Sequence, residues 1–176
     1  MSIDHGTLKV VAQDASDVSR DAEVSTGRDA VAQPFRLLVG AVAVLVIGYV
    51  HYYLYFQGGY RGIAPESFAG LTISRAFAVN AIAGLIIGWA LVVSLRVPKL
   101  AAPAALAGVA FAVATLAAYV LTRTVGLLGF KDDQSVTEAV VAVIAELVAL
   151  GSLGSWLASS VRASRGHLEA QRFTNR

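Results

Sequence analysis

The sequence predicts an all-α fold, a four-helix transmembrane bundle with both termini in the cytoplasm. Of its 176 residues, 56% are hydrophobic and 15% are charged, whereas about a quarter of the residues in a soluble domain are charged. The charged residues crowd into segments that lie between four long apolar runs. Each run has roughly 20–25 residues, which is enough for a helix to cross ~30 Å of hydrocarbon.

The segment before the first run, residues 1–35, is expected to be a disordered acidic arm in the cytoplasm. It lacks apolar periodicity, and its first 33 residues hold six acidic and three basic side chains. A segment of this composition cannot bury enough apolar surface to fold. No apolar core of a signal peptide follows Met1, so we do not expect a cleaved leader.

The transmembrane domain is predicted to cover residues 36–160, as four spans joined by short links. The link 96–100 makes the second and third spans an antiparallel hairpin, and Pro103 falls in the first turn of the third span, where proline is tolerated. The links on the opposite side, 57–67 and roughly 125–135, are too short to form domains. The four predicted spans are residues 37–56, 71–95, 101–124 and 136–160.

Basic residues near the span ends predict the orientation, because positively charged loops stay on the cytoplasmic side. Nine basic residues flank the side that holds both termini, four of them in a basic tail at 161–176, and four lie on the other side. We therefore expect a multi-pass protein of the inner (plasma) membrane, oriented N-in/C-in. The nine are Arg20, Arg28, Arg36, Arg96, Lys99, Arg162, Arg165, Arg172 and Arg176, and the four are Arg61, Arg75, Arg123 and Lys131.

Small residues are expected to hold the helices together, because apolar side chains gain little from leaving lipid and close packing drives association instead. Gly84 and Gly88 form a GxxxG motif in the second span, and Gly108 lies in a stripe of small residues in the third. The motif favours packing inside the bundle, while a homodimer contact is the alternative.

Polar side chains gather in the outer half of the predicted bundle, and the inner half is almost purely apolar. They either fix the register of the helices or line a small cavity that faces outward and binds a small molecule, a proton or an ion. Aromatic residues near the outer end of the first span, including Tyr60, are expected to form an interfacial belt, and the rim of a pocket is the alternative. The six members of the polar cluster are His51, Arg75, Asn80, Arg123, Glu138 and Glu146.

Glu146 is the most informative member of this cluster. It lies roughly 15 Å from the start of its span at helical rise. An ionised carboxylate at that depth costs several kcal/mol unless it is paired, so Glu146 is expected to be protonated or to face a cation. Arg123 is the favoured partner and His51 the second, although Arg123 can also pair with Glu138.

Several functional classes lack the residues that they need. The chain has no cysteine and a net charge of only +2, which argues against thiolate metal sites and against nucleic acid as a partner. The possible metal ligands are too few for a zinc or copper site, and no second histidine lies inside a span for two-histidine haem ligation. We expect no cofactor, no metal and, in the absence of a catalytic motif, no enzymatic activity.

Five short segments, spaced along the chain, are similar to segments of a known family of membrane proteins. They are HYYLY (51–55), YRGI (60–63), FAVNAIA (77–83), LTRTVGLLGF (121–130) and VIAEL (143–147). Over residues 37–160 the chain resembles an uncharacterised family of small four-span integral membrane proteins found widely in actinobacteria. The resemblance implies the fold and an actinobacterial source but no activity. The acidic arm, the loop 57–67 and the segment 132–134 depart from the pattern.

The sequence thus favours a non-catalytic accessory or scaffold subunit of a larger membrane complex. Small size, short loops and the lack of a chemical motif support this interpretation. The alternative is binding or transport of a small molecule, proton or ion through the polar cluster. The expected partners are the lipid bilayer and either another membrane protein or further copies of this chain.

Overall fold

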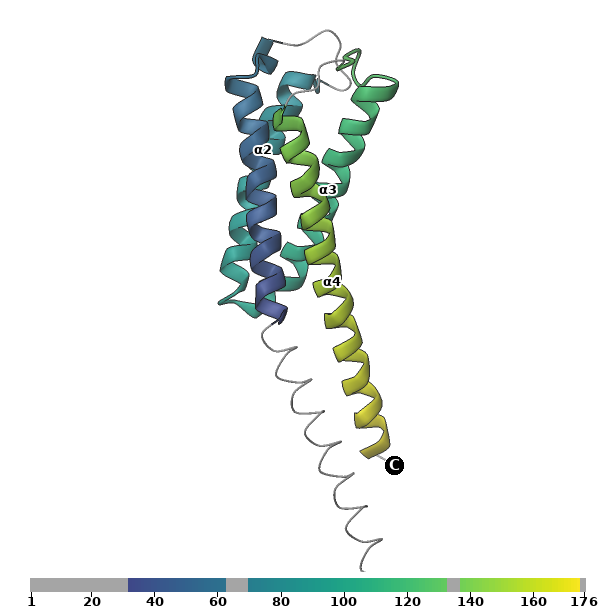
Figure 1. Ribbon diagram of the computed structural model, residues 1–176. Coiled ribbons are helices and arrows are strands. Elements are labelled where there is room, and N and C mark those ends of the chain that lie inside the picture. Colours follow the sequence, from purple (N-terminus) through teal and green to yellow (C-terminus); the bar gives the residue numbers. More distant parts are fainter. Residues whose placement is uncertain (1–31, 63–69, 133–136, 175–176) are drawn as a thin grey trace, which may run out of the picture. The chain divides into compact units, whose positions relative to one another are not determined.

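The computed structural model describes residues 32–62, 70–132 and 137–174. The predicted acidic arm therefore lies almost wholly outside the described residues. Within these ranges the chain is helical and contains no strand beyond an isolated bridge. Four helices are long and apolar enough to cross a membrane, and they confirm the predicted all-α, four-helix transmembrane fold (Figure 1).

The first of these helices, Ala32–Phe56, is called the first span below. The 3-10 helix η1 (Tyr60–Gly62) follows it, and α2 covers Ile73–Ser94. A second 3-10 helix, η2 (Pro98–Leu100), leads into α3. The remaining helices are α3, Ala101–Thr124, and α4, Thr137–Thr174.

Local chemistry determines where these helices begin. The hydroxyl of Thr72 accepts a hydrogen bond from the backbone N–H of Arg75 at 3.2 Å, so α2 starts at Ile73, slightly later than the sequence indicates. Pro98 is the first residue of η2. Proline is tolerated there because a backbone N–H at the start of a helix would have no partner within the helix. At the other end of the chain, α4 continues as a helix through most of the basic tail (Figure 1).

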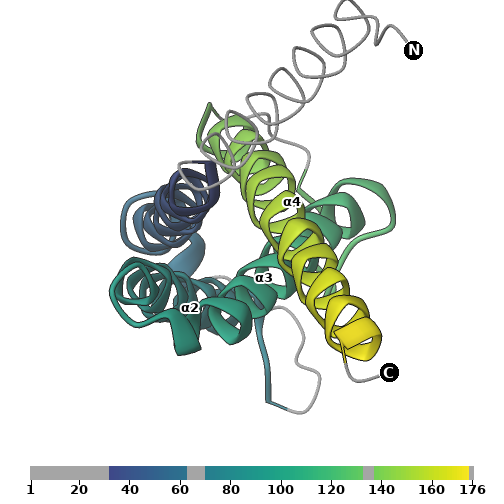
Figure 2. The same cartoon turned by 90° about the horizontal axis from the view of Figure 1, so that it is seen from below.

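The helices pack in a ring, in the order first span, α2, α3, α4 (Figure 2). Gly48 of the first span lies against Gly84 of α2, while Leu153 of α4 reaches both Gly40 and Gly108. Alpha carbons without side chains allow this close approach of backbones. Gly84, Gly88 and Gly108 all face neighbouring helices inside the bundle, with Leu45 packed on Gly88.

The bundle has two ends with different contents. The η1 end holds η1 and the turn from Val125 to Asp132, and a small apolar cluster that includes Leu54 and Ile73 packs there. The η2 end holds η2 and the start of the first span. Between the middle of the bundle and the η2 end runs a larger hydrophobic core that includes Leu91 and Leu153. Of the three buried polar side chains in the described ranges, Thr115 and Glu146 lie toward the η1 end and Ser94 lies at the η2 end.

Candidate functional site

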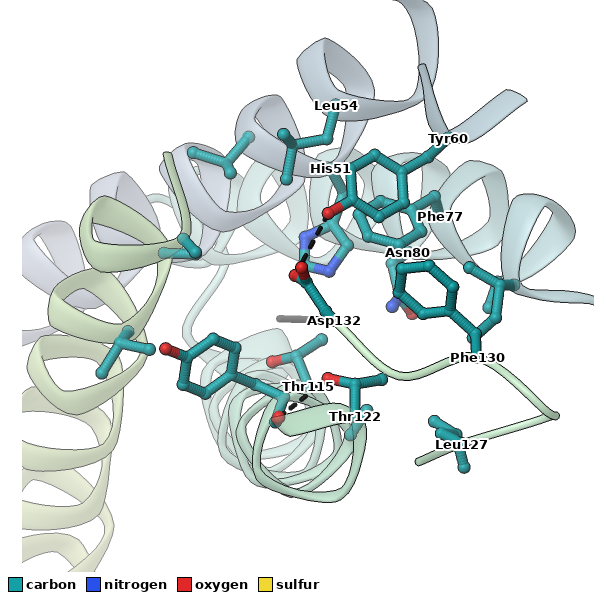
Figure 3. A pocket seen from close by; sticks show the side chains of 18 of the residues that line it. His51, Leu54, Tyr60, Phe77, Asn80, Thr115, Thr122, Leu127, Phe130 and Asp132 are labelled. Carbon is teal, nitrogen blue, oxygen red and sulfur yellow. Dashed lines mark hydrogen bonds between the residues drawn. The ribbon is translucent and has the colours of Figure 1, made fainter. Parts of the chain in front are cut away.

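A cavity of about 100 Å³ lies at the η1 end, enclosed by all four helices together with η1 and the turn after α3 (Figure 3). Apolar side chains form most of its wall, and polar groups from every helix face into it. This mixture of an apolar wall with a few placed polar groups is typical of a ligand site. The polar lining residues are His51, Tyr60, Asn80, Thr115, Tyr119, Thr122, Asp132 and Glu146.

Tyr60 and Asp132 close the mouth of the cavity. The Tyr60 hydroxyl donates to Oδ2 of Asp132 at 3.2 Å, as the dashed line in Figure 3 shows. The Tyr60 ring is buried against Phe77, at 4.4 Å between centroids, and Phe130, at 5.8 Å. Burial, reinforced by the nearby Asp132 carboxylate, raises the pKa of Tyr60 to about 12, so the phenol remains a neutral donor.

A tight turn places Asp132 over the cavity. Leu127 and Phe130 exchange two backbone hydrogen bonds of 2.8 and 2.9 Å, and the two residues between them, Leu128 and Gly129, have φ of 51° and 67°. Glycine adopts this left-handed backbone without strain, which leucine rarely does. The backbone N–H of Asp132 then donates to the Thr122 carbonyl of α3 at 3.1 Å. The turn thus folds back and fixes the carboxylate at the mouth.

His51 and Asn80 lie deeper, on the wall formed by the first span and α2. Nδ1 of His51 is 2.9 Å from the carbonyl of Ile47, and because a carbonyl only accepts, Nδ1 must donate. In the neutral imidazole this leaves Nε2 as an acceptor. The ring also packs on Phe77 at 5.3 Å between centroids, which holds its orientation.

Glu146 and Thr115 form the floor of the cavity. Their exposures are 2% and 4%, and at helical rise each lies roughly 14 Å from the η1-end terminus of its helix. Thr115 hydrogen-bonds with the Glu146 carboxyl, and its hydroxyl also donates to the carbonyl of Phe111 at 3.0 Å. Oε2 of Glu146 has no hydrogen-bond partner among the described residues.

The structure divides the six residues of the predicted cluster into two groups. His51, Asn80 and Glu146 line the cavity, whereas Arg75, Arg123 and Glu138 do not. Arg75 is exposed and donates to the carbonyl of Gly70. Glu138 lies half-buried in the first turn of α4.

The favoured partner of Glu146 is not where the sequence suggests. Nη1 of Arg123 donates to the backbone carbonyl of Asp132 at 3.0 Å, and the guanidinium lies over the ring of Tyr119 at 5.5 Å. Because α3 ends at Thr124, Arg123 lies near the mouth while Glu146 lies on the floor. No cation from the described residues is therefore seen on the Glu146 carboxylate.

The predicted cluster lacked five of the eight polar residues that line the cavity. Tyr60 is buried at the mouth and is not part of an exposed interfacial belt. Thr115, Tyr119 and Thr122 sit at three- and four-residue spacing in α3, a spacing that indicates one helix face. Asp132 follows a glycine-rich segment, which signals a turn. These signals existed, but none of them identifies the face that points inward.

The cavity is a small polar site that opens toward the η1 end of the bundle. In the ranges that the structure describes, no three His, Cys, Asp or Glu side chains group as they would around a metal ion. Below Glu146 the packing is apolar and includes Leu91, Ala112 and Leu153, each with 0% exposure. The site therefore offers carboxylate, imidazole and hydroxyl groups to a small ligand that comes from the η1 end.

Comparison of the chain with models of protein families, with curated proteins and with solved structures found no match.

Proposed function

We propose that the chain is an integral protein of the inner (plasma) membrane, with both termini in the cytoplasm. The described residues contain four membrane-compatible helices, an even number, which supports placing both termini on one side. Six basic residues of the described ranges lie toward the η2 end and four at the η1 end, which favours the cytoplasmic side for the η2 end. The six are Arg36, Arg96, Lys99, Arg162, Arg165 and Arg172, and the four are Arg61, Arg75, Arg123 and Lys131. The cavity then opens away from the cytoplasm. Membership of the actinobacterial four-span family is part of the same proposal.

Within this membrane protein, the proposed function is reversible binding of a proton or of another small monovalent cation at Glu146. One observation carries the proposal: a fully buried carboxyl oxygen faces a cavity without any partner among the described residues. Intramembrane acidic groups that lack a protein cation are typically sites for a proton or an ion. The cavity has room for several water molecules and not for a large solute.

The other polar groups of the cavity fit a cation better than an anion. Nε2 of neutral His51 can accept a hydrogen bond on the way in, and Glu146 offers a carboxyl group on the floor. The Thr115 hydroxyl can donate its proton to an ionised Glu146. When it donates to the Phe111 carbonyl instead, its oxygen is able to accept a hydrogen bond from a protonated Glu146.

Infrared difference spectroscopy of the purified protein in lipid tests this function. Changing the pH, or adding sodium, potassium or ammonium, should change a carboxyl band, and Glu146→Gln should remove that change. Glu138→Gln is the matched control, because Glu138 does not line the cavity. If Glu146→Gln responds like the unmodified protein, the proposal is wrong.

A second candidate function is that of a non-catalytic accessory subunit of a larger membrane complex. The observation that favours it concerns α2, of which only 17% is buried inside the bundle, compared with 50% of the first span. Its exposed face carries Ile82, Leu85 and Trp89. Such a face suits a helix of another membrane protein as well as lipid.

Native mass spectrometry of the protein released from its own membranes tests this second function. A partner chain in fixed stoichiometry that is lost in Ile82→Ser and Leu85→Ser supports an accessory role. A single chain, or a homo-oligomer unchanged by these substitutions, argues against it. The two proposals are thus tested separately, one by a carboxyl group and the other by a helix face.

A further inference from the structure

A second hollow lies between the first span and α4, on the outer surface of the bundle. It is a groove of about 480 Å³ whose lining residues are all apolar. Ala43 and Ala145 are buried on its floor, while Val42 and Ile144 stand on its rim with 53% and 56% of their surface exposed. The small residues on the floor keep the groove open. We call it the span 1–α4 groove.

The groove points toward a basic site at the η2 end. On the first span it begins at Leu38, and the half-buried Arg36 lies just before it. Nη1 of Arg36 donates to the hydroxyl of Ser159 on α4 at 3.3 Å, so the guanidinium bridges the two helices that form the groove. Arg162 is exposed one turn further along α4.

The charge of Arg36 has no acidic counterpart among the side chains that the structure describes. The acids among them, Asp132, Glu138 and Glu146, all belong to the η1 end or to the first turns of α4. A guanidinium offers five N–H donors, and one hydroxyl satisfies a single donor. A group with several acceptor oxygens, such as a phosphate, matches the remaining donors.

We infer that this groove binds one phospholipid with an anionic headgroup, its acyl chain along the groove and its phosphate on Arg36. The first-span wall of the groove, from Leu38 to Val46, is roughly 12 Å long at helical rise, and its α4 wall, from Val141 to Val148, continues toward the η1 end. The headgroup then lies at the η2 surface, where basic side chains attract anionic lipids. This inference does not depend on the function proposed for the cavity.

Another groove on the same helix serves as an internal comparison. It lies between the first span and α2, has a volume of about 280 Å³, and is lined by residues that include Leu45, Tyr52 and Ile82. No basic side chain lines either groove. The two differ because Arg36 bridges the helices of the span 1–α4 groove just before that groove begins. Lipid chains can fill the comparison groove too.

The test is native mass spectrometry of the full-length protein with added phosphatidylglycerol or phosphatidylcholine. We expect about fivefold more bound phosphatidylglycerol, the preference that a single basic residue provides near a membrane surface. Arg36→Gln should abolish the preference, while Arg96→Gln, an exposed basic position at the same end, should retain it. Equal binding of the two lipids to the unmodified protein would overturn the inference.

A second pair of variants tests the groove itself. Val42→Trp fills the groove from its rim and should abolish the binding of both phosphatidylglycerol and phosphatidylcholine. Ile82→Trp fills the comparison groove and should leave this binding unchanged. If Val42→Trp does not fold, Ile144→Trp repeats the test from α4. Retention of phosphatidylglycerol at the unmodified level by a folded groove-filling variant would show that the lipid binds elsewhere.

Discussion

The two halves of the bundle are built on different principles. In the η2 half, side chains such as Leu91 and Leu153 pack without exposure against glycine and alanine. In the η1 half, the same four helices diverge around a cavity and direct histidine, threonine and glutamate into it. Close packing is concentrated in the η2 half, so the η1 half can keep a cavity and a buried acid. We therefore expect stability and binding to respond to different substitutions.

The largest effect on stability is expected from Leu153→Ala in the η2 half. The Leu153 side chain fills the space beside Gly40 and Gly108 and is fully buried, so its truncation leaves a cavity and costs about 3 kcal/mol. Unfolding in mixed detergent micelles measures the loss. Leu147→Ala is the control, because Leu147 is 55% exposed on the same helix. Similar losses in both variants would contradict the role given to the η2 half.

A smaller loss is expected where the first span crosses α2. A β-carbon added at Gly84 would lie 2.6 Å from the Cα of Gly48, and the helices must separate to admit it. Overpacking of this kind makes Gly84→Ala about 2 kcal/mol less stable. At Gly154 an added β-carbon meets nothing within 4 Å, so Gly154→Ala should be neutral or stabilising. The same unfolding assay compares the two, and equal behaviour would rule out the close contact.

In the η1 half, Tyr60→Phe removes the hydrogen bond to Asp132 and should cost about 1 kcal/mol. The pKa of Tyr60 is raised to about 12 by burial and then by the Asp132 carboxylate, against an ordinary value of 10.0. This contribution is therefore complete below pH 10 and is lost as the pH rises to 12. The stability difference between Tyr60→Phe and the unmodified protein should shrink over that range. A difference that stays constant would show that Tyr60 is not buried in this way.

The smallest effect concerns Arg123 and Glu146. Arg123 contacts the Asp132 carbonyl and the Tyr119 ring, so removal of its guanidinium should not change the environment of the Glu146 carboxyl group. A double-mutant cycle of Arg123→Gln and Glu146→Gln should give a coupling below about 0.5 kcal/mol, as for sites without direct contact. A coupling of several times that value would support the Arg123–Glu146 ion pair that the sequence suggests.

The sequence predicted the fold well because each span is a long apolar run, and such a run has few alternatives in a bilayer. It also identified Glu146 correctly as buried, since an acid within an apolar helix is rare enough to be noticed. The predicted bounds of the second span are close to those of α2 because that span is a long apolar run. The cap at Thr72 accounts for the small difference at its start.

The contacts between helices were harder to predict, because they depend on helix rotation and on where each helix ends. Thr115 is unremarkable in the sequence and becomes informative only because the fold places it beside Glu146 on the cavity floor. Arg123 looked deep enough to pair with Glu146 if α3 continued to Gly129, but the helix stops at Thr124. Gly48 has no motif of its own, and its importance comes from the Gly84 that it meets.

The depth of Glu146 has an electrical consequence. A cation that moves from the η1 surface to this carboxylate travels roughly 14 Å into a ~30 Å hydrocarbon layer, and so crosses up to about half of the transmembrane voltage. At about 2.3 kcal/mol per charge for each 100 mV across the whole layer, occupancy of the floor changes by up to roughly 1 kcal/mol per 100 mV. In the proposed orientation, with the η2 end facing a negative cytoplasm, an energised membrane would draw the proposed cation toward Glu146, and a depolarised membrane would release it.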